Sequence, residues 1–236
     1  MHLRKREHQN PPWMTPDQRN TTLTFDPGCY PFHEIIAACI GVSPAELSGL
    51  RADLPPERYE AGGSIYKHIE RADAHRALYA GLDGPRGADF YATYAAFVRE
   101  EIAPQFDVPI SYQLKPSHRI LFLDAPGESR YHRDRDYGHD PAECNFFVPQ
   151  TRAHATNSMF VESAPGAGDF APAELSLGEY LRFDGANCAH GAHVNQTGRT
   201  RVSFDFRVIP SHLTAPTPGD LSGNPVQDNA LRFVEL

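Results

Sequence analysis

Four side chains in the second half of the chain have the types and the spacing of a metal site beside an anion clamp. His132 and Asp134 lie two residues apart, and Arg201 follows His190 by eleven residues. On an extended segment, residues two apart point to the same side, so His132 and Asp134 can offer a nitrogen and an oxygen to one ion. Two histidines and one carboxylate occupy one face of an octahedral iron and leave three positions open. The pattern therefore predicts a metal centre held by His132, Asp134 and His190.

The same residues carry a resemblance to a known family. An HxD motif, a distant His, an Arg eleven residues later and a Ser two beyond it resemble the Fe(II)/2-oxoglutarate-dependent oxygenases. The stretch HGAHVNQTGRTR, which begins at His190, is similar to their phytanoyl-CoA-hydroxylase-like branch. The runs YHRDRDYGHDPAECNFFVP, FDG and GRTRVSFDFRVIP resemble oxygenases of aminoglycoside and other antibiotic biosynthesis. The resemblance covers about residues 110–210.

The resemblance implies a dioxygenase that uses Fe(II), O2 and 2-oxoglutarate as cosubstrate. Oxidative decarboxylation of 2-oxoglutarate would be coupled to C–H oxidation, by hydroxylation or a related reaction, of a small polar secondary metabolite. Arg201 would bind the far carboxylate of 2-oxoglutarate, because a planar guanidinium matches a carboxylate with two hydrogen bonds. Ser203 would point the same way on a strand and add a hydroxyl contact. Asp134 argues against halogenation, since related halogenases have a small residue in its place.

Several polar and aromatic residues flank the metal motif. In the look-alike oxygenases this region lies near the substrate mouth, and a solvated charged loop is an equally good interpretation. The residues that we expect there as substrate contacts are Tyr131, Arg133, Asp136, Tyr137 and Asn145.

Two other histidines compete for the metal. His193 lies three residues from His190, so a regular strand sends it to the opposite face. His139 has no carboxylate two residues away. We also expect residues 195–198 to form a hairpin loop between strands 187–194 and 200–209. That pairing would put His190 opposite Arg201 to Ser203, on one face. The alternating residues Val202, Phe204, Phe206 and Val208 would point to the other face, into packing.

The elements that must position these residues fall into two halves. Apolar spacing predicts helices over 32–40, 64–82 and 88–103, with a further helix start at Ser43-Pro44-Ala45-Glu46. After residue 104, short segments rich in Tyr, Phe, Val and Ile favour strands over 110–114, 118–124, 144–149, 157–163, 179–184, 187–194 and 200–209. We expect one domain over 1–236 of class α+β, mainly β. Residues 1–105 would form a helical buttress, 106–210 a double-stranded β-helix (jelly roll, cupin-like) core, and 211–236 a tail.

Bulk composition excludes several classes of partner. The formal net charge is −8 without a basic block, which argues against nucleic acid and an anionic membrane. No apolar run approaches the roughly 18 residues that a membrane span needs. The basic N-terminus lacks the apolar stretch of a secretory signal, and the four cysteines are widely spaced. We expect a cytoplasmic protein with reduced thiols and a small-molecule substrate; the oligomeric state is not readable.

Two other functions fit part of the pattern. A cupin-like metalloenzyme without 2-oxoglutarate would keep the three metal ligands but would not need Arg201. A non-catalytic jelly-roll protein would bind a ligand beside a structural ion. His132-Arg133-Asp134 also matches the start of a protein-kinase catalytic loop, but no Asn follows at the required spacing and no glycine-rich loop occurs.

Overall fold

A large antiparallel sheet forms the centre of the molecule. The computed structural model describes residues 18–52, 73–125, 130–214 and 232–236. The sheet has seven strands, and β3 (Ser117–Leu121) pairs with β9 outside the main path. The order of the other six is β1 (Thr21–Thr24), β7 (Glu179–Phe183), β4 (Cys144–Pro149), β9 (Arg201–Pro210), β2 (Ile110–Gln113) and β10 (Phe233–Glu235).

A smaller antiparallel sheet has three strands in the order β6 (Ala171–Pro172), β5 (Met159–Val161) and β8 (His190–Ala192). A buried apolar cluster joins the two sheets. It contains Phe147 of β4 and Phe183 of β7 from the large sheet, together with Met159 and Val161 of β5. This junction holds the smaller sheet against the face of the large sheet that is turned away from the helices. It also places His190, which lies on β8, beside that face.

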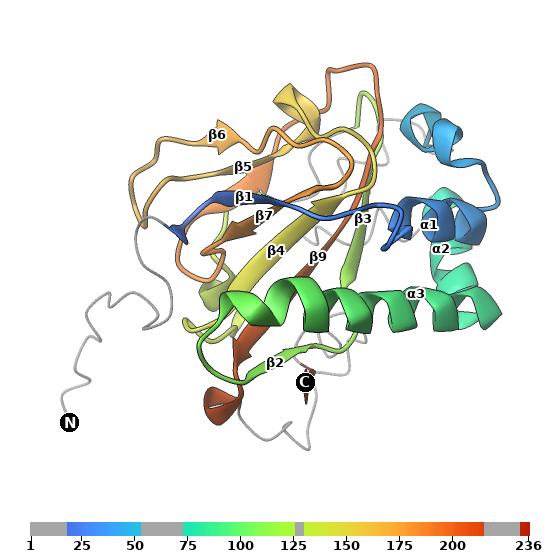
Figure 1. Cartoon of the computed structure of the whole chain (residues 1–236). Coiled ribbons are helices and arrows are strands. Elements are labelled where there is room, and N and C mark those ends of the chain that lie inside the picture. The colour runs from blue at the N-terminus through green and yellow to red at the C-terminus, as the bar shows by residue number, and fades with distance from the viewer. Residues whose placement is uncertain (1–17, 53–72, 126–129, 215–231) are drawn as a thin grey trace.

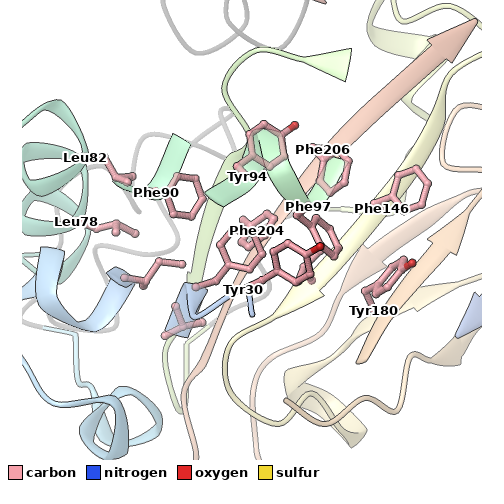
Figure 2. Close-up of a cluster of buried hydrophobic side chains, with 14 of the residues drawn as sticks. Tyr30, Leu78, Leu82, Phe90, Tyr94, Phe97, Phe146, Tyr180, Phe204 and Phe206 are labelled. Carbon is pink, nitrogen blue, oxygen red and sulfur yellow. The ribbon is translucent and has the colours of Figure 1, made fainter. Parts of the chain in front are cut away.

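Helices cover the other face of the large sheet (Figure 1). They are α1 (Phe32–Ile40), α2 (Asp73–Asp83) and α3 (Pro85–Phe97), and α3 continues through the turns Val98–Ile102 and Ala103–Gln105. Phe90, Tyr94 and Phe97 recur at helical spacing and are buried. Figure 2 shows them beside Phe204 and Phe206 of β9.

Successive residues of β9 point to opposite faces of the sheet, and the two faces have different roles. Val202, Phe204, Phe206 and Val208 are fully buried in the helix-side core, as the sequence predicted. The alternate residues that begin with Arg201 point away from the helices, and three of these line a pocket: Arg201, Asp205 and Arg207. One strand therefore supports the core with one face and the candidate site with the other.

Each predicted strand overlaps an observed strand. The predicted helix 32–40 is observed with the same bounds, and the predicted helix 88–103 is observed with shifted ends. Ser43 and Glu46 form the predicted capping box, although the turn that follows (Pro44–Gly49) is a 3-10 helix. Strands β1, β6 and β10 were not predicted. Three parts of the predicted layout lie outside the described residues: 1–17, the part of the predicted helix 64–82 before Asp73, and 215–231 of the predicted tail 211–236. Among the described helices, none has the length and apolarity of a membrane span.

The predicted hairpin is wrong. Strand β8 pairs with β5, where Val161 lies opposite His190, and β9 pairs with β2, β3 and β4. The intervening loop is held by Asn195, whose amide donates to the carbonyls of Leu121 and Phe122 at 3.2 and 3.1 Å. These long-range hydrogen bonds hold the segment that joins β8 of the smaller sheet to β9 of the large sheet. His190 and Arg201 therefore reach one pocket from different sheets, and not from the two strands of one hairpin.

Candidate metal centre

The three predicted metal ligands converge on one point. His132 and His190 exchange backbone hydrogen bonds of 3.0 and 2.9 Å as an isolated bridge. Asp134 begins the 3-10 turn Asp134–Tyr137, and its amide donates to the carbonyl of Gly185 at 3.0 Å. One ligand atom from each of His132, Asp134 and His190 lies within 4.8 Å of the others. Among the described residues, this is the group that can hold a metal ion.

Both imidazoles are fixed through their Nδ1 atoms. His132 Nδ1 lies 2.8 Å from the carbonyl of Arg130, and His190 Nδ1 lies 3.1 Å from the carbonyl of Cys188. A carbonyl accepts, so each Nδ1 carries the proton and each Nε2 keeps its lone pair. The Nε2 atoms lie 3.5 and 3.6 Å from Asp134 Oδ1. Two lone pairs and one carboxylate oxygen therefore face one position, which fits a divalent metal.

The charges of the site favour metal binding. Burial would raise the pKa of Asp134, but the Arg207 guanidinium outweighs it and helps to hold that pKa well below its usual range. Burial lowers the pKa of His190, although Asp134 opposes the shift. Asp134 is thus ionised and His190 is neutral, and these are the protonation states that a metal requires.

A pocket opens beside these ligands, and Arg201 lies in it. Arg201 is 3% exposed, and its guanidinium lies 5.2 Å from the centre of the Phe147 ring. Ser203 is fully buried, and within the described part of the chain its hydroxyl has no hydrogen-bond partner. The pocket is lined by Arg119, His132, Asp134, Asn145, Phe147, Met159, Phe183, His190, Gly191, Ala192, Arg201, Asp205 and Arg207.

Sequence reasoning missed three charged residues of this pocket. Arg119 of β3 donates from Nε to Asp205 Oδ1 at 2.9 Å, and Arg207 donates from Nε to Asp134 Oδ2 at 2.8 Å. Asp205 and Arg207 continue the two-residue alternation that begins at Arg201, so that period could have found them. Arg119 had no comparable local signal, because it reaches the pocket through strand pairing.

The predicted substrate residues are not gathered in one place. Arg133 and Asp136 pair with each other at 3.0 Å, and Tyr137 is 56% exposed with its ring 5.4 Å from that of His132. Tyr131 donates or accepts at 2.9 Å with His193 Nε2 and packs on Phe170. Asn145 is buried, and its amide donates to Asp134 Oδ2 at 2.7 Å. Of the five, Asn145 alone lines the pocket.

The competing histidines lie outside the cluster. His193 is exposed beside Tyr131, and His139 Nδ1 lies 2.8 Å from Glu143. Cys188 is fully buried in the apolar cluster between the sheets, and burial raises its pKa to about 12. These placements favour His190 as the third ligand and a packing role for Cys188.

No family model matches the chain. The streptomycin biosynthesis protein StrG of Streptomyces griseus is 35% identical over 197 residues, which are 83% of this chain and 87% of that protein.

Solved structures are more distant. The non-heme alpha-ketoglutarate-dependent epimerase SnoN from nogalamycin biosynthesis is 16% identical, with a TM-score of 0.45 and coverage of 89% of this chain and 88% of that one. AviO1 of Streptomyces viridochromogenes Tue57 is 17% identical, with a TM-score of 0.45 and coverage of 85% and 94%. CytC3 with Fe(II) and alpha-ketoglutarate is 14% identical, with a TM-score of 0.41 and coverage of 84% and 77%. At these TM-scores, the functional assignment rests on the residues of the site itself.

Proposed function

The chain belongs to the family of the streptomycin biosynthesis protein StrG, and from its metal centre we propose that it is an Fe(II)- and 2-oxoglutarate-dependent oxygenase. Its substrate would be a small polar compound of secondary metabolism, oxidised at a C–H bond in the cytoplasm. One observation carries the proposal: His132, Asp134 and His190 surround one point, and Arg201 lies in the same pocket. A cupin-like enzyme without 2-oxoglutarate would not require that arginine.

The side chains of this chain fit the two groups. When bound, Fe(II) with 2-oxoglutarate supplies the activation of O2. Two neutral imidazoles and one carboxylate leave three metal positions open, which suits a chelating keto acid and one further ligand. Arg201 would hold the far carboxylate of 2-oxoglutarate, because a buried guanidinium forms strong paired hydrogen bonds with a carboxylate. The Ser203 hydroxyl, which lies on the same face of β9, would add a donor.

The aromatic side chains that line the pocket would exclude water and orient the bound carboxylate. Phe147 covers Arg201, and the Phe183 ring lies 5.2 Å from the His190 ring. Apolar cover lowers the local dielectric, which strengthens the pairing of Arg201 with a carboxylate. We assign the two sheets to a jelly-roll core on the same grounds: both are antiparallel, and the site lies where they meet.

The test compares substitutions of His190 and His193, which lie three residues apart. Purified protein loaded with Fe(II) under anaerobic conditions is given 2-oxoglutarate, ascorbate, air and a panel of aminated and hydroxylated small molecules, and succinate is measured. We expect succinate release to fall by more than about 100-fold in His190→Ala, because losing a metal ligand should cost more than the roughly 10- to 100-fold lost with a residue that only orients a ligand. The matched control His193→Ala should retain the wild-type rate.

Three results would refute the proposal. The first is succinate release by His190→Ala at the wild-type rate. The second is Fe(II) binding by the wild-type protein without 2-oxoglutarate binding, which would favour a metalloenzyme of another kind. Fe(II) and 2-oxoglutarate binding without succinate from any substrate would favour the non-catalytic function.

A further inference from the structure

Two buried side chains hold one oxygen of the metal-binding carboxylate. Asp134 Oδ2 accepts from Asn145 Nδ2 at 2.7 Å and from Arg207 Nε at 2.8 Å. Asp134, Asn145 and Arg207 are 2%, 2% and 6% exposed, so water cannot easily replace either donor. We propose that Asn145 and Arg207 are positioning residues that restrict Asp134 to metal binding through Oδ1 alone. This inference rests on the proposed metal centre.

The geometry distinguishes the two carboxylate oxygens. Oδ1 faces the metal position, at 3.5 and 3.6 Å from the two histidine Nε2 atoms. Oδ2 already accepts two hydrogen bonds, which occupy its lone pairs. A carboxylate that bound through both oxygens would take one of the three open metal positions, and a chelating keto acid would then fill the remaining two. Binding through Oδ1 alone keeps the third position available.

A second layer of contacts immobilises Arg207. Its Nη1 donates to Gln113 Oε1 at 3.2 Å, and its Nε lies 3.7 Å from Glu143 Oε2. His139 Nδ1 lies 2.8 Å from the same Glu143 oxygen. The guanidinium therefore has partners besides Asp134, and it cannot swing aside without leaving buried groups unpaired.

Gly185 provides the room for Asn145. A Cβ at this position would lie 2.6 Å from Asn145 Cγ and 2.7 Å from Phe183 Cε2, distances that real Cβ atoms essentially never show. The carbonyl of Gly185 also accepts from the amide of Asp134 at 3.0 Å, so the glycine backbone and Asn145 hold the same residue from two directions. A side chain at 185 would clash with the Asn145 amide and with the Phe183 ring, although it replaces no proposed metal ligand.

The experiment measures metal binding, so it does not depend on turnover. Co(II) is titrated into metal-free Asn145→Leu and Gly185→Ala under anaerobic conditions, and the ligand-field absorption and the affinity for 2-oxoglutarate are recorded. We expect Co(II) affinity to fall about 10- to 100-fold in both, the usual effect of losing a hydrogen bond to a metal ligand. The absorption should change because the carboxylate gains freedom to bind through both oxygens.

The matched control is Asn157→Leu. Asn157 is also a fully buried asparagine, but its amide donates to the carbonyl of Arg152 and touches no ligand. We expect its Co(II) affinity and absorption to stay at the wild-type values, and thermal unfolding identifies any variant that has lost its fold. Wild-type Co(II) affinity and absorption in both Asn145→Leu and Gly185→Ala would overturn the inference.

A crystal structure of the wild-type Co(II) complex decides the question without any substitution. A single Co–Oδ1 bond supports the inference, and a bond from Oδ2 to the metal overturns it. The outcome is separable from the proposed function: Co(II) and 2-oxoglutarate binding without succinate release from Fe(II)-loaded protein would refute the oxygenase and leave the role of Asn145 and Arg207 standing.

Discussion

At the residue scale, the candidate site depends on which atom of each side chain is already engaged. The histidines use Nδ1 on backbone carbonyls, and Asp134 uses Oδ2 on Asn145 and Arg207. The atoms left over, two Nε2 and one Oδ1, are the ones that face the metal position. Hydrogen bonds made elsewhere therefore select the donor atoms of the metal site.

Arg201 provides a prediction at the same scale. Replacing it with Ala should weaken 2-oxoglutarate binding to the Co(II)-loaded protein about 10- to 100-fold, since hydrogen bonds to a charged group contribute about 1.5–3 kcal/mol. Co(II) affinity should not change, because Arg201 is not a ligand. Arg199→Ala is the control, since Arg199 is exposed and two residues away. Equal 2-oxoglutarate affinity in Arg201→Ala and wild type would remove the carboxylate role from Arg201.

At the scale of elements, the helices fix the position of β9 by packing on its apolar face. Phe32 of α1 lies 5.0 Å from Phe204, and Tyr94 of α3 lies 5.2 Å from Phe206, measured between ring centres. A small residue in α2 lets α1 and α2 pack closely against each other above the sheet. A Cβ at Gly81 of α2 would lie 2.6 Å from Cys39 Cβ and 2.7 Å from Cys39 Cα, both in α1.

Gly81→Ala should therefore destabilise the protein although alanine favours a helix by about 1 kcal/mol. The clash involves the α1 backbone, so the helices must separate, and overpacking of this kind costs about 1–3 kcal/mol. Denaturant unfolding should show a net loss of up to about 2 kcal/mol. Gly49→Ala is the comparison, because a Cβ there meets nothing within 4 Å. A stability gain in Gly81→Ala would contradict the close α1–α2 contact.

At the scale of the whole molecule, two buried histidines lie where the helices meet the large sheet. His118 of β3 packs its ring 4.9 Å from Phe90 of α3, and His75 of α2 lies 3.3 Å from the carbonyl of His118. Burial lowers the pKa of His118 to about 3 and that of His75 to about 4. Both remain neutral in the folded protein while an unfolded chain binds a proton near pH 6.5.

The sign of the pH dependence follows from that difference. Below about pH 6.5 the unfolded state holds more protons, so stability is complete above that pH and falls as the pH drops toward 4 and 3. His118→Leu should reduce the loss of unfolding free energy between pH 7.5 and pH 5 by about 2 kcal/mol. Chemical denaturation at both pH values measures it, with the exposed His212→Leu as control. An unchanged pH dependence in His118→Leu would show that His118 is protonated in the fold.

The sequence determined which side chains form the candidate site and on which face of their strand they lie. The face of a strand depends on local backbone alternation, so the HxD pair and the apolar residues Val202, Phe204, Phe206 and Val208 were predicted correctly. The assignment of His190 and Arg201 came from the resemblance to the oxygenase family, and both residues line the pocket.

Only the tertiary structure decided which strands are neighbours. His190 and Arg201 reach one pocket from different sheets, because Asn195 binds carbonyls more than 70 positions away and redirects the chain. The hold of Asn145 and Arg207 on Asp134, the room left by Gly185 and the Arg119–Asp205 pair also depend on such distant contacts. Backbone alternation is a property of consecutive residues, whereas strand partnership depends on how two sheets and a helical layer bury their apolar surfaces together.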